Sequence, residues 1–227
     1  MVEGFSKSPP NPFLVQFAER ERQRGSRRLL DIGCGASRNA LPLARAGWDV
    51  FAVDLSLAML QAAVQRAATE QVAGRVHFAL AAMNAIPARD GTFDLVVAHG
   101  IWNLARSSRE FRQAVREAAR VGRPGCALFV FTFSRNTLPP DALPVAGEEF
   151  VFTQFSGEPQ CFLTADQLIS ELRDAGFVRD PQFPLQEHNL PKPGAIGAGK
   201  VPVIYEGIFR RDPDGAARAG GMTTRDR

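Results

Sequence analysis

Two carboxylates and two glycines lie close together in the stretch RRLLDIGCGASRNALPLARAGWDVFAVDLS, residues 27–56. Asp31, Gly33 and Gly35 close one apolar run, and Asp54 ends the next. Glycine lets the backbone approach a ligand closely, and the amides that open the following helix favour negative charge. A carboxylate at the end of a strand can accept hydrogen bonds from two ribose hydroxyls. This spacing predicts a site for a cofactor that contains a nucleoside.

The details of the glycine turn discriminate between nucleoside cofactors. A dinucleotide fingerprint has a third glycine where this sequence has Arg38, and a phosphate-binding P-loop has a lysine that this turn lacks. Asp31 would repel a pyrophosphate, whereas it can orient a cationic amino acid group. The sequence therefore argues against NAD, and a nicotinamide-dependent oxidoreductase stays as a minor alternative.

The elements that must position these residues alternate between apolar runs and helix-like segments. Strand, helix and strand at this spacing predict right-handed crossovers and a mostly parallel sheet covered on both faces. We expect strands at 29–32, 50–53, 76–80, 95–98, 128–133 and 201–211. We expect helices at 38–46, 57–69 and 109–121, and a capped helix within 163–177.

Segments outside this alternation have their own character. In 1–24, a Pro- and Ser-rich start precedes a helix with Phe13 and Phe17 at i and i+4, which is either a lid or a packing helix. Residues 25–210 form the expected main domain. Within it, 134–162 is irregular and rich in Pro, Gly and Phe, which indicates a cover over the substrate. The tail at 211–227 lacks an apolar period and is predicted to be disordered.

Composition narrows the class of protein. A chain of 227 residues with 45% hydrophobic content can bury one substantial core. It contains neither the roughly 20 apolar residues of a membrane span nor the apolar core of an export signal, so we expect a cytoplasmic protein. Cys34, Cys126 and Cys161 are odd in number and far apart, which suits neither disulfides nor a metal site. The net charge of +3 is spread along the chain and does not indicate nucleic-acid binding.

Taken in order, the motifs resemble those of class I S-adenosylmethionine-dependent methyltransferases over about residues 29–210. LLDIGCG resembles the first motif of that family, VFAVDLS its ribose-binding acidic motif, DGTFDLVVAHG its fourth strand and REAARVGRPGCALFVF its fifth. The continuation RNALPLARAGWDV is similar to the UbiE- and tellurite-resistance-like branch, which acts on small molecules. The resemblance implies a doubly wound, Rossmann-like α/β fold with a mostly parallel seven-stranded sheet and an antiparallel last strand.

The resemblance also implies roles for the residues of the first two motifs. Asp31, Gly33 and Gly35 would surround the methionine part of S-adenosylmethionine. Asp54 would bind the ribose, and Leu55 would flank the adenine.

Two positions depart from the family pattern. Ser37 stands where a glycine is often found, and Ala82 stands where an acidic residue often meets the adenine amino group. The backbone of Met83 or the side chain of Asn84 would then have to serve the adenine.

The chemistry of methyl transfer asks little of the protein. A sulfonium methyl group is already activated, so transfer mainly needs in-line alignment and exclusion of water. His99 closes the fourth strand and is the candidate catalytic residue, because it would meet cofactor or substrate there; a structural strand-end histidine is the alternative. The candidate substrate contacts are Phe13, Phe17, Trp102, Arg135 and Phe155. The alternative is a structural role, which is core packing for the aromatic residues and a solvated side chain for Arg135.

The acceptor is narrowed mainly by what the sequence lacks. The residues after the fourth strand read AHGIW, unlike the Asn/Asp-Pro-Pro-Tyr signature of nucleic-acid amino methylases. We therefore predict a small-molecule acceptor, with no nucleic-acid or membrane partner, and leave open its acceptor atom and the oligomeric state. A non-catalytic S-adenosylmethionine-binding or partner-binding protein on the same fold is the alternative.

Overall fold

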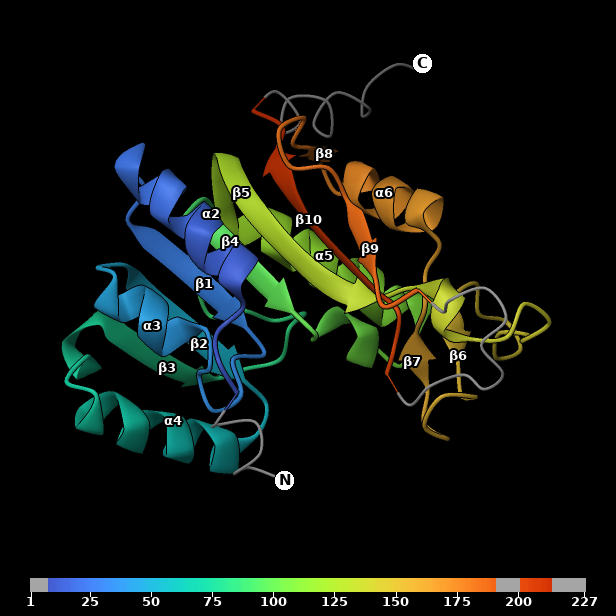
Figure 1. Ribbon diagram of the computed structural model, residues 1–227, viewed down its shortest axis with the longest axis horizontal. Helices are drawn as coiled ribbons and strands as arrows, with labels where there is room; N and C mark the ends of the chain where they lie inside the picture. Colours follow the sequence, from blue (N-terminus) through green and yellow to red (C-terminus); the bar gives the residue numbers. More distant parts are fainter. Residues whose placement is uncertain (1–7, 191–200, 214–227) are drawn as a thin grey trace, which may run out of the picture.

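The structure, a computed structural model, describes residues 8–190 and 201–213 (Figure 1). The strands are β1 (Arg28–Ile32), β2 (Asp49–Asp54), β3 (Val76–Leu80), β4 (Phe93–His99), β5 (Gly122–Phe133), β6 (Val151–Phe152), β7 (Gln160–Cys161), β8 (Phe177–Arg179), β9 (Gln186–His188) and β10 (Ile204–Arg211). The α-helices are α2 (Pro12–Gln23), α3 (Ala40–Arg45), α4 (Leu57–Thr69), α5 (Ser108–Val121) and α6 (Ala165–Asp174). Short 3-10 helices are η1 (Ala73–Arg75), η2 (Trp102–Leu104) and η3 (Arg135–Thr137).

The large sheet has the strand order β3-β2-β1-β4-β5-β10-β8, and β9 also pairs with β10. Strands β1 to β5 run parallel, and β10 runs antiparallel to β5. This confirms the predicted doubly wound, Rossmann-like fold with an antiparallel last strand. The strand order reverses between β1 and β4, and in such sheets ligands bind beyond the carboxyl ends of the strands at this reversal.

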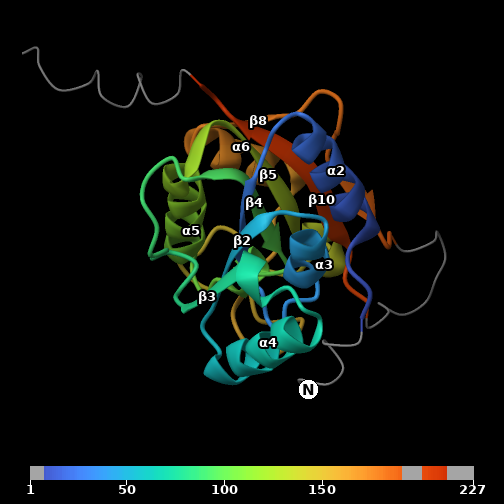
Figure 2. The same ribbon diagram turned by 90° about the vertical axis from the view of Figure 1, so that its left-hand side faces the viewer.

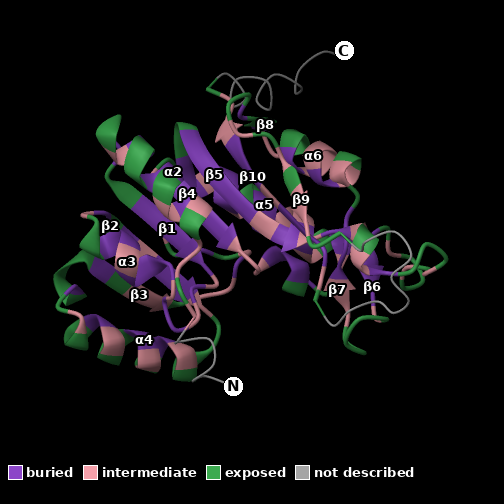
Figure 3. Cartoon of the chain, in the orientation of Figure 1, coloured by how far each residue is buried: buried purple, intermediate pink, exposed green. Residues whose placement is uncertain are grey.

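Successive strand residues alternate between two apolar layers, as the pleat of a buried strand requires. Leu29 packs in the layer under α2, α3 and α4, whereas Leu30 packs in the layer that contains residues of α5 and α6. Figures 1 and 2 show α2 and α3 on one face of the sheet and α5 on the other. Figure 3 shows the strands as the buried middle of the molecule.

The neighbour of β10 at the edge of the large sheet consists of two short strands instead of one continuous strand. β8 and β9 both pair with β10, in the registers Arg179↔Phe209 and Gln186↔Glu206. Pro181 lies between them, and proline cannot donate to a strand ladder. The large sheet therefore has eight strands instead of the seven that we predicted.

The segment 134–162, predicted as an irregular cover, contains η3 and a two-stranded sheet of β6 and β7. Its two ends lie side by side, because Ser134 forms an isolated bridge with Leu163 and the amide of Arg135 donates to the Leu163 carbonyl at 2.8 Å. We call residues 134–162 the β6–β7 insert. It lies at one end of the sheet, below β9 in the view of Figure 1.

Helix α2 packs on the sheet. Phe17 is 1% exposed, its ring lies 5.2 Å from that of Phe183, and Arg210 of β10 forms two 2.7 Å hydrogen bonds with the buried Glu21. Of the two readings of this helix, packing rather than a lid fits these contacts. The predicted mobile start and disordered tail fall mainly on 1–7 and 214–227, outside the described residues.

Candidate active site

A cavity of about 610 Å³ opens beyond the carboxyl ends of β1, β2, β4 and β5. We call it the strand-end cavity. Its lining includes five residues that the sequence analysis singled out for the cofactor or for catalysis: Asp31, Gly33, Gly35, Asp54 and His99. It also includes Arg38, Met59, Asn103, Phe131, Phe133 and Gln160. The structure thus brings both acidic residues, the glycine turn and the strand-end histidine to one place.

The glycine turn has a left-handed backbone at several positions. Gly33, Gly35 and Ser37 have φ values of 69°, 52° and 62°. Glycine adopts this region freely, whereas Ser37 does so at an energetic cost. A Cβ added at Gly35 would meet no atom within 4 Å, so this position faces open space that a ligand can fill. A Cβ at Gly33 would meet the side chain of Ile101 at 2.5 Å, so close packing already explains that glycine.

Asp54 holds the glycine turn as well as facing the cavity. Its Oδ2 accepts a hydrogen bond from the amide of Gly35, and its Oδ1 accepts one from the amide of Ser56, both at 2.8 Å. A carboxylate oxygen has two lone pairs, so each oxygen can accept a further hydrogen bond from a ligand. The carboxylate therefore links the turn after β1 to the start of α4 and can still bind hydroxyls.

Asp31 is a buried carboxylate without a direct ion pair among the described residues. It is 3% exposed, and within the described residues no side chain forms a hydrogen bond or ion pair with it. Burial, and then the charge of Asp54, raise the pKa of Asp31 to about 7, while Arg38 opposes the rise. A cationic ligand group in the cavity would stabilise the ionised form of this carboxylate.

His99 lies in a row of side chains that crosses the sheet. It pairs in register with Phe131 of β5, which pairs in turn with Glu206 of β10. The imidazole stacks on the Phe131 ring, with centroids 4.1 Å apart and planes 8° apart. The two rings therefore lie face to face, and both belong to the lining of the strand-end cavity.

Arg38 covers the other side of the imidazole. One guanidinium nitrogen lies 3.3 Å from Nδ1 and 3.4 Å from Nε2 of His99. A nitrogen that is equally close to both would collide with the carbon between them if it lay in the ring plane, so it lies over the ring face. Burial and the charge of Arg38 lower the pKa of His99 to about 4. The imidazole is therefore neutral at physiological pH.

Asn11, the N-cap of α2, joins this helix to the site. Its Oδ1 accepts a hydrogen bond from the amide of Leu14 at 3.0 Å. Its Nδ2 donates to Oε1 of Glu206 at 2.7 Å and lies 3.4 Å from Nε2 of His99. One capping residue thus fixes the start of α2 above the row of side chains.

The residues predicted to recognise adenine are not part of the cavity lining. Leu55 is 70% exposed. Ala82, Met83 and Asn84 lie in the loop after β3, and Met83 is buried in the core beside Ile86. The cavity reaches Met59 of α4 on this side instead. A direct contact of residues 82–84 with the adenine stays a prediction.

The residues predicted to contact the substrate are placed elsewhere. Phe13 packs on Phe129 and Phe183, and Trp102 is a fully buried core residue. The Arg135 guanidinium donates to backbone carbonyls of its own insert and lies 4.9 Å from the centroid of the Phe152 ring.

Phe155 is a predicted substrate contact that packs on a residue of the cavity lining. It is 37% exposed and packs on Phe133, a lining residue, with centroids 5.4 Å apart. The structure brings neither it nor Phe13, Phe17, Trp102 and Arg135 into the lining of the strand-end cavity.

Several residues that line the strand-end cavity were not singled out as site residues from the sequence. Phe131 and Phe133 carry a signal, because they alternate at the carboxyl end of a strand and so come close to the ligand side of the sheet. Asn103 and Gln160 carry none that we can identify, since a 3-10 turn and the β6–β7 insert determine where they lie. From the sequence, Arg38 was considered as the residue that replaces a third glycine and as a group that could attract an anionic acceptor, with a solvated arginine favoured over the second role.

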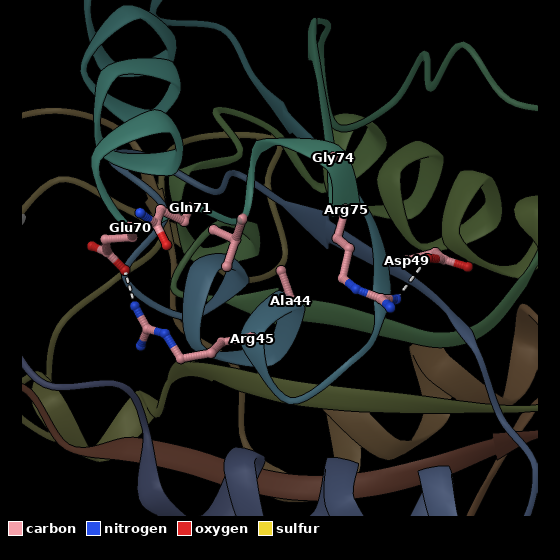
Figure 4. A pocket seen from close by; sticks show the side chains of 8 residues that line it. Ala44, Arg45, Asp49, Glu70, Gln71, Gly74 and Arg75 are labelled. Carbon is pink, nitrogen blue, oxygen red and sulfur yellow. Dashed lines mark hydrogen bonds and ion pairs between the residues drawn. The ribbon is translucent and has the colours of Figure 1, made fainter.

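A second hollow of about 710 Å³ lies among the ends of α3 and α4 and the η1 turn (Figure 4). Its charged side chains pair with each other, Arg45 with Glu70 at 2.7 Å and Arg75 with Asp49 at 3.5 Å. Asp49 begins β2, so this hollow is at the amino ends of the strands, opposite the edge where such sheets bind ligands.

Other classes of site find little support in the part of the chain that the structure describes. Within 8–190 and 201–213, no group of three or more His, Cys, Asp or Glu side chains is placed to hold a metal ion. The same residues include no helix that is long and apolar enough to cross a membrane. Burial raises the thiol pKa of Cys34, Cys126 and Cys161, which keeps all three protonated.

Comparison with known proteins gives a match to one family model. Residues 29–125, somewhat less than half of the chain, match the model described as a methyltransferase domain. The chain is therefore similar to methyltransferases over this region. This matched region contains β1 to β4 and the residues of the strand-end cavity up to Leu104.

The similar proteins match half of this chain or more. A demethylmenaquinone methyltransferase of Renibacterium salmoninarum is 34% identical over 114 residues, which cover 50% of this chain and 44% of that protein. The ubiquinone/menaquinone biosynthesis C-methyltransferase UbiE of Dinoroseobacter shibae is 29% identical over 172 residues, 68% of this chain and 67% of that protein. The chain thus spans less than half of the first relative and about two thirds of the second.

The fold is shared more widely than the sequence. A solved structure of a SAM-dependent methyltransferase from Methanosarcina mazei matches with a TM-score of 0.70 at 21% identity, covering 90% of this chain and 99% of that one. At this identity the likeness shows the fold, and function must be argued from the site.

Proposed function

We propose that this protein transfers the methyl group of S-adenosylmethionine directly, in line, to a nucleophile of a small molecule. The observation that carries the proposal is Asp31, a buried carboxylate that faces the same cavity as Asp54 and the glycine turn. Such a site suits a ligand that combines a cationic amino acid group with a ribose. The names of the two relatives, which refer to quinone biosynthesis, support a small-molecule acceptor.

The cavity residues fit this cofactor. Asp31 would hold its ammonium group, and Asp54 would accept hydrogen bonds from the ribose hydroxyls with the lone pairs that the backbone leaves available. Gly35 leaves space where any other residue would place a Cβ. When bound, S-adenosylmethionine supplies an activated methyl group, and the protein needs to orient it and exclude water.

His99 has a role in this proposal that differs from a general base. Efficient general bases have a pKa near the working pH, whereas that of His99 is lowered to about 4. The neutral imidazole can still accept a hydrogen bond from the acceptor. This arrangement suits an acceptor that loses its own proton readily, and we propose that His99 orients it.

The remaining expectations are part of the same proposal. We propose a cytoplasmic protein that does not bind nucleic acid, and both expectations are based on the sequence. The competing hypothesis is a protein that binds S-adenosylmethionine without catalysing transfer.

Calorimetry with S-adenosylhomocysteine tests the cofactor site first. We expect binding by the wild-type protein, no binding of NAD, and a rise in melting temperature with S-adenosylhomocysteine concentration. Turnover of S-adenosylmethionine on a panel of phenols, thiols and amines then tests catalysis. Cofactor binding with no turnover on any acceptor would favour the non-catalytic alternative, and absence of cofactor binding would refute the proposal.

A further inference from the structure

Asn103 is a buried side chain at the strand-end cavity with an unsatisfied polar atom. It lies in η2, four residues after the end of β4, and is 2% exposed. Its Oδ1 is buried and has no hydrogen-bond partner among the described residues. Burial of an amide oxygen without a partner is unfavourable, so native proteins avoid it unless another group completes the bond.

Asn103 differs in its location from the other residues that have a buried polar side-chain atom without a hydrogen-bond partner. Buried side-chain atoms without partners also occur in Ser37, Trp48, Trp102, Thr132 and His188, within the described ranges. Of these residues, Asn103 alone belongs to the lining of the strand-end cavity. A half-turn about the Cβ–Cγ bond exchanges the oxygen and nitrogen of the amide, so either atom can face a ligand there.

The surroundings of Asn103 indicate the shape of that ligand. Phe131 and Phe133 line the same cavity, and the imidazole of His99 stacks face to face on the Phe131 ring. Phe133 is supported from behind by the rings of Phe155 and Phe162, at 5.4 and 5.3 Å. Walls made of stacked rings favour a planar aromatic ligand over a branched aliphatic one.

The charges at this end of the cavity indicate an acidic hydroxyl. Arg38 forms no ion pair within the residues that the structure describes, and its guanidinium lies at the cavity over neutral His99. A nearby cation favours the ionised form of an acidic group. A hydroxyl can also donate to the amide oxygen of Asn103 and accept from its nitrogen.

We propose that Asn103 determines acceptor specificity by hydrogen bonding to the hydroxyl of a planar aromatic methyl acceptor. This inference rests on the proposed function, because it assumes that the cofactor occupies the Asp31 and Asp54 side of the same cavity. Asn103 thereby recognises the acceptor and is separate from the groups that hold the cofactor.

Two probes that differ only in the hydroxyl test the inference. The affinities of 1-naphthol and naphthalene are measured by calorimetry with the wild-type protein saturated with S-adenosylhomocysteine. We expect 1-naphthol to bind at least roughly tenfold more tightly, because naphthalene has no polar atom and leaves the amide unpaired. In Asn103→Leu, which replaces the amide by an apolar group of similar volume, the preference should fall to about twofold or less.

Thr132→Val is the matched control. Thr132 also has a buried hydroxyl without a partner, and it lies between two lining residues without lining the cavity itself. This variant should keep the full preference for 1-naphthol. Both variants should keep the wild-type affinity for S-adenosylhomocysteine and a melting temperature no lower than that of the wild type.

Several outcomes would overturn the inference. An unchanged preference in Asn103→Leu would show that the amide does not recognise the hydroxyl, and a large loss of S-adenosylhomocysteine affinity would assign Asn103 to the cofactor. If Asn103→Leu fails to fold, Asn103→Ala is measured in the same way. A wild-type protein that binds S-adenosylhomocysteine but shows no preference between the probes refutes this inference alone, whereas one that does not bind S-adenosylhomocysteine refutes the proposed function.

Discussion

Asp31 should make cofactor binding depend on pH. Burial beside Asp54 raises its pKa to about 7, and the cationic group of the cofactor binds the ionised form. With that pKa, roughly 10% of the carboxylate is ionised at pH 6 and roughly 90% at pH 8. Since the apparent affinity scales with the competent fraction, binding should tighten about tenfold from pH 6 to pH 8 and about a hundredfold from pH 5 to pH 8.

The stability of the ligand-free protein should change in the opposite direction. The pKa of an aspartate in the unfolded chain is about 3.8, so between about pH 4 and pH 7 the folded protein retains a proton that the unfolded chain releases. The free energy of unfolding contributed by Asp31 therefore falls as the pH rises through this window. Stability falls with pH while cofactor affinity rises, and this opposition is characteristic of a raised carboxylate pKa.

Calorimetry with S-adenosylhomocysteine at four pH values between 5 and 8 measures the effect. Near pH 6, titration in buffers with different ionisation enthalpies should show that binding releases about one proton. Asp31→Asn has a neutral amide at every pH and should show neither the slope nor the proton release. A flat profile in the wild-type protein, or the same slope in Asp31→Asn, would refute the reasoning.

The remaining predictions concern the turn and the packing around it. Gly35→Ala should abolish binding of S-adenosylhomocysteine in a protein that still folds. Gly33→Ala should mainly lower the urea midpoint of unfolding, because its Cβ would overlap the side chain of Ile101. Equal effects of the two variants on binding and on stability would contradict this prediction. Asp54→Ala should weaken cofactor binding by roughly ten- to a hundredfold and also destabilise the fold by about 1–3 kcal/mol, since two backbone amides lose their acceptor. Arg210→Met should lower the free energy of unfolding by roughly 1.5–3 kcal/mol in urea titrations, because it removes two charge-assisted hydrogen bonds of buried Glu21, which then keeps only the pair with Arg24. A double variant with Glu21→Gln should recover part of that loss, and absence of any recovery would count against a charge effect.

The sequence predicted the parallel part of the fold well because buried parallel strands are continuous apolar runs. Predicted strands at 29–32 and 95–98 correspond to β1 and β4. Helix α3 is shorter than predicted, because residues 36–39 form turns before it begins at Ala40. The split into β8 and β9 was missed, since each piece has only three residues and shows no clear periodicity.

The candidate site was predictable only where the backbone decides it. Asp31 and Asp54 follow from strand ends and glycine turns, which sequence spacing reveals. The contact between Arg38 and His99 joins side chains 61 positions apart, and the burial of Asn103 depends on a single 3-10 turn. The role of Phe17 could not be predicted from the sequence, because an apolar helical edge has the same pattern whether it covers a ligand or packs on a sheet.

The neighbouring ends of the β6–β7 insert have an evolutionary consequence. Because Ser134 and Leu163 lie side by side, this segment leaves and rejoins the sheet at nearly the same point. Segments with adjacent ends can be exchanged with little disturbance to the rest of a fold, here provided that the replacement fills the core positions of Phe150, Val151 and Phe162. The insert contributes Gln160 to the strand-end cavity, while Asp31, Gly35 and Asp54, to which we assign the cofactor in our proposal, all precede position 60. Duplicated copies of such a gene can therefore acquire different methyl acceptors by exchanging the β6–β7 insert. The residues proposed to bind the cofactor can stay unchanged.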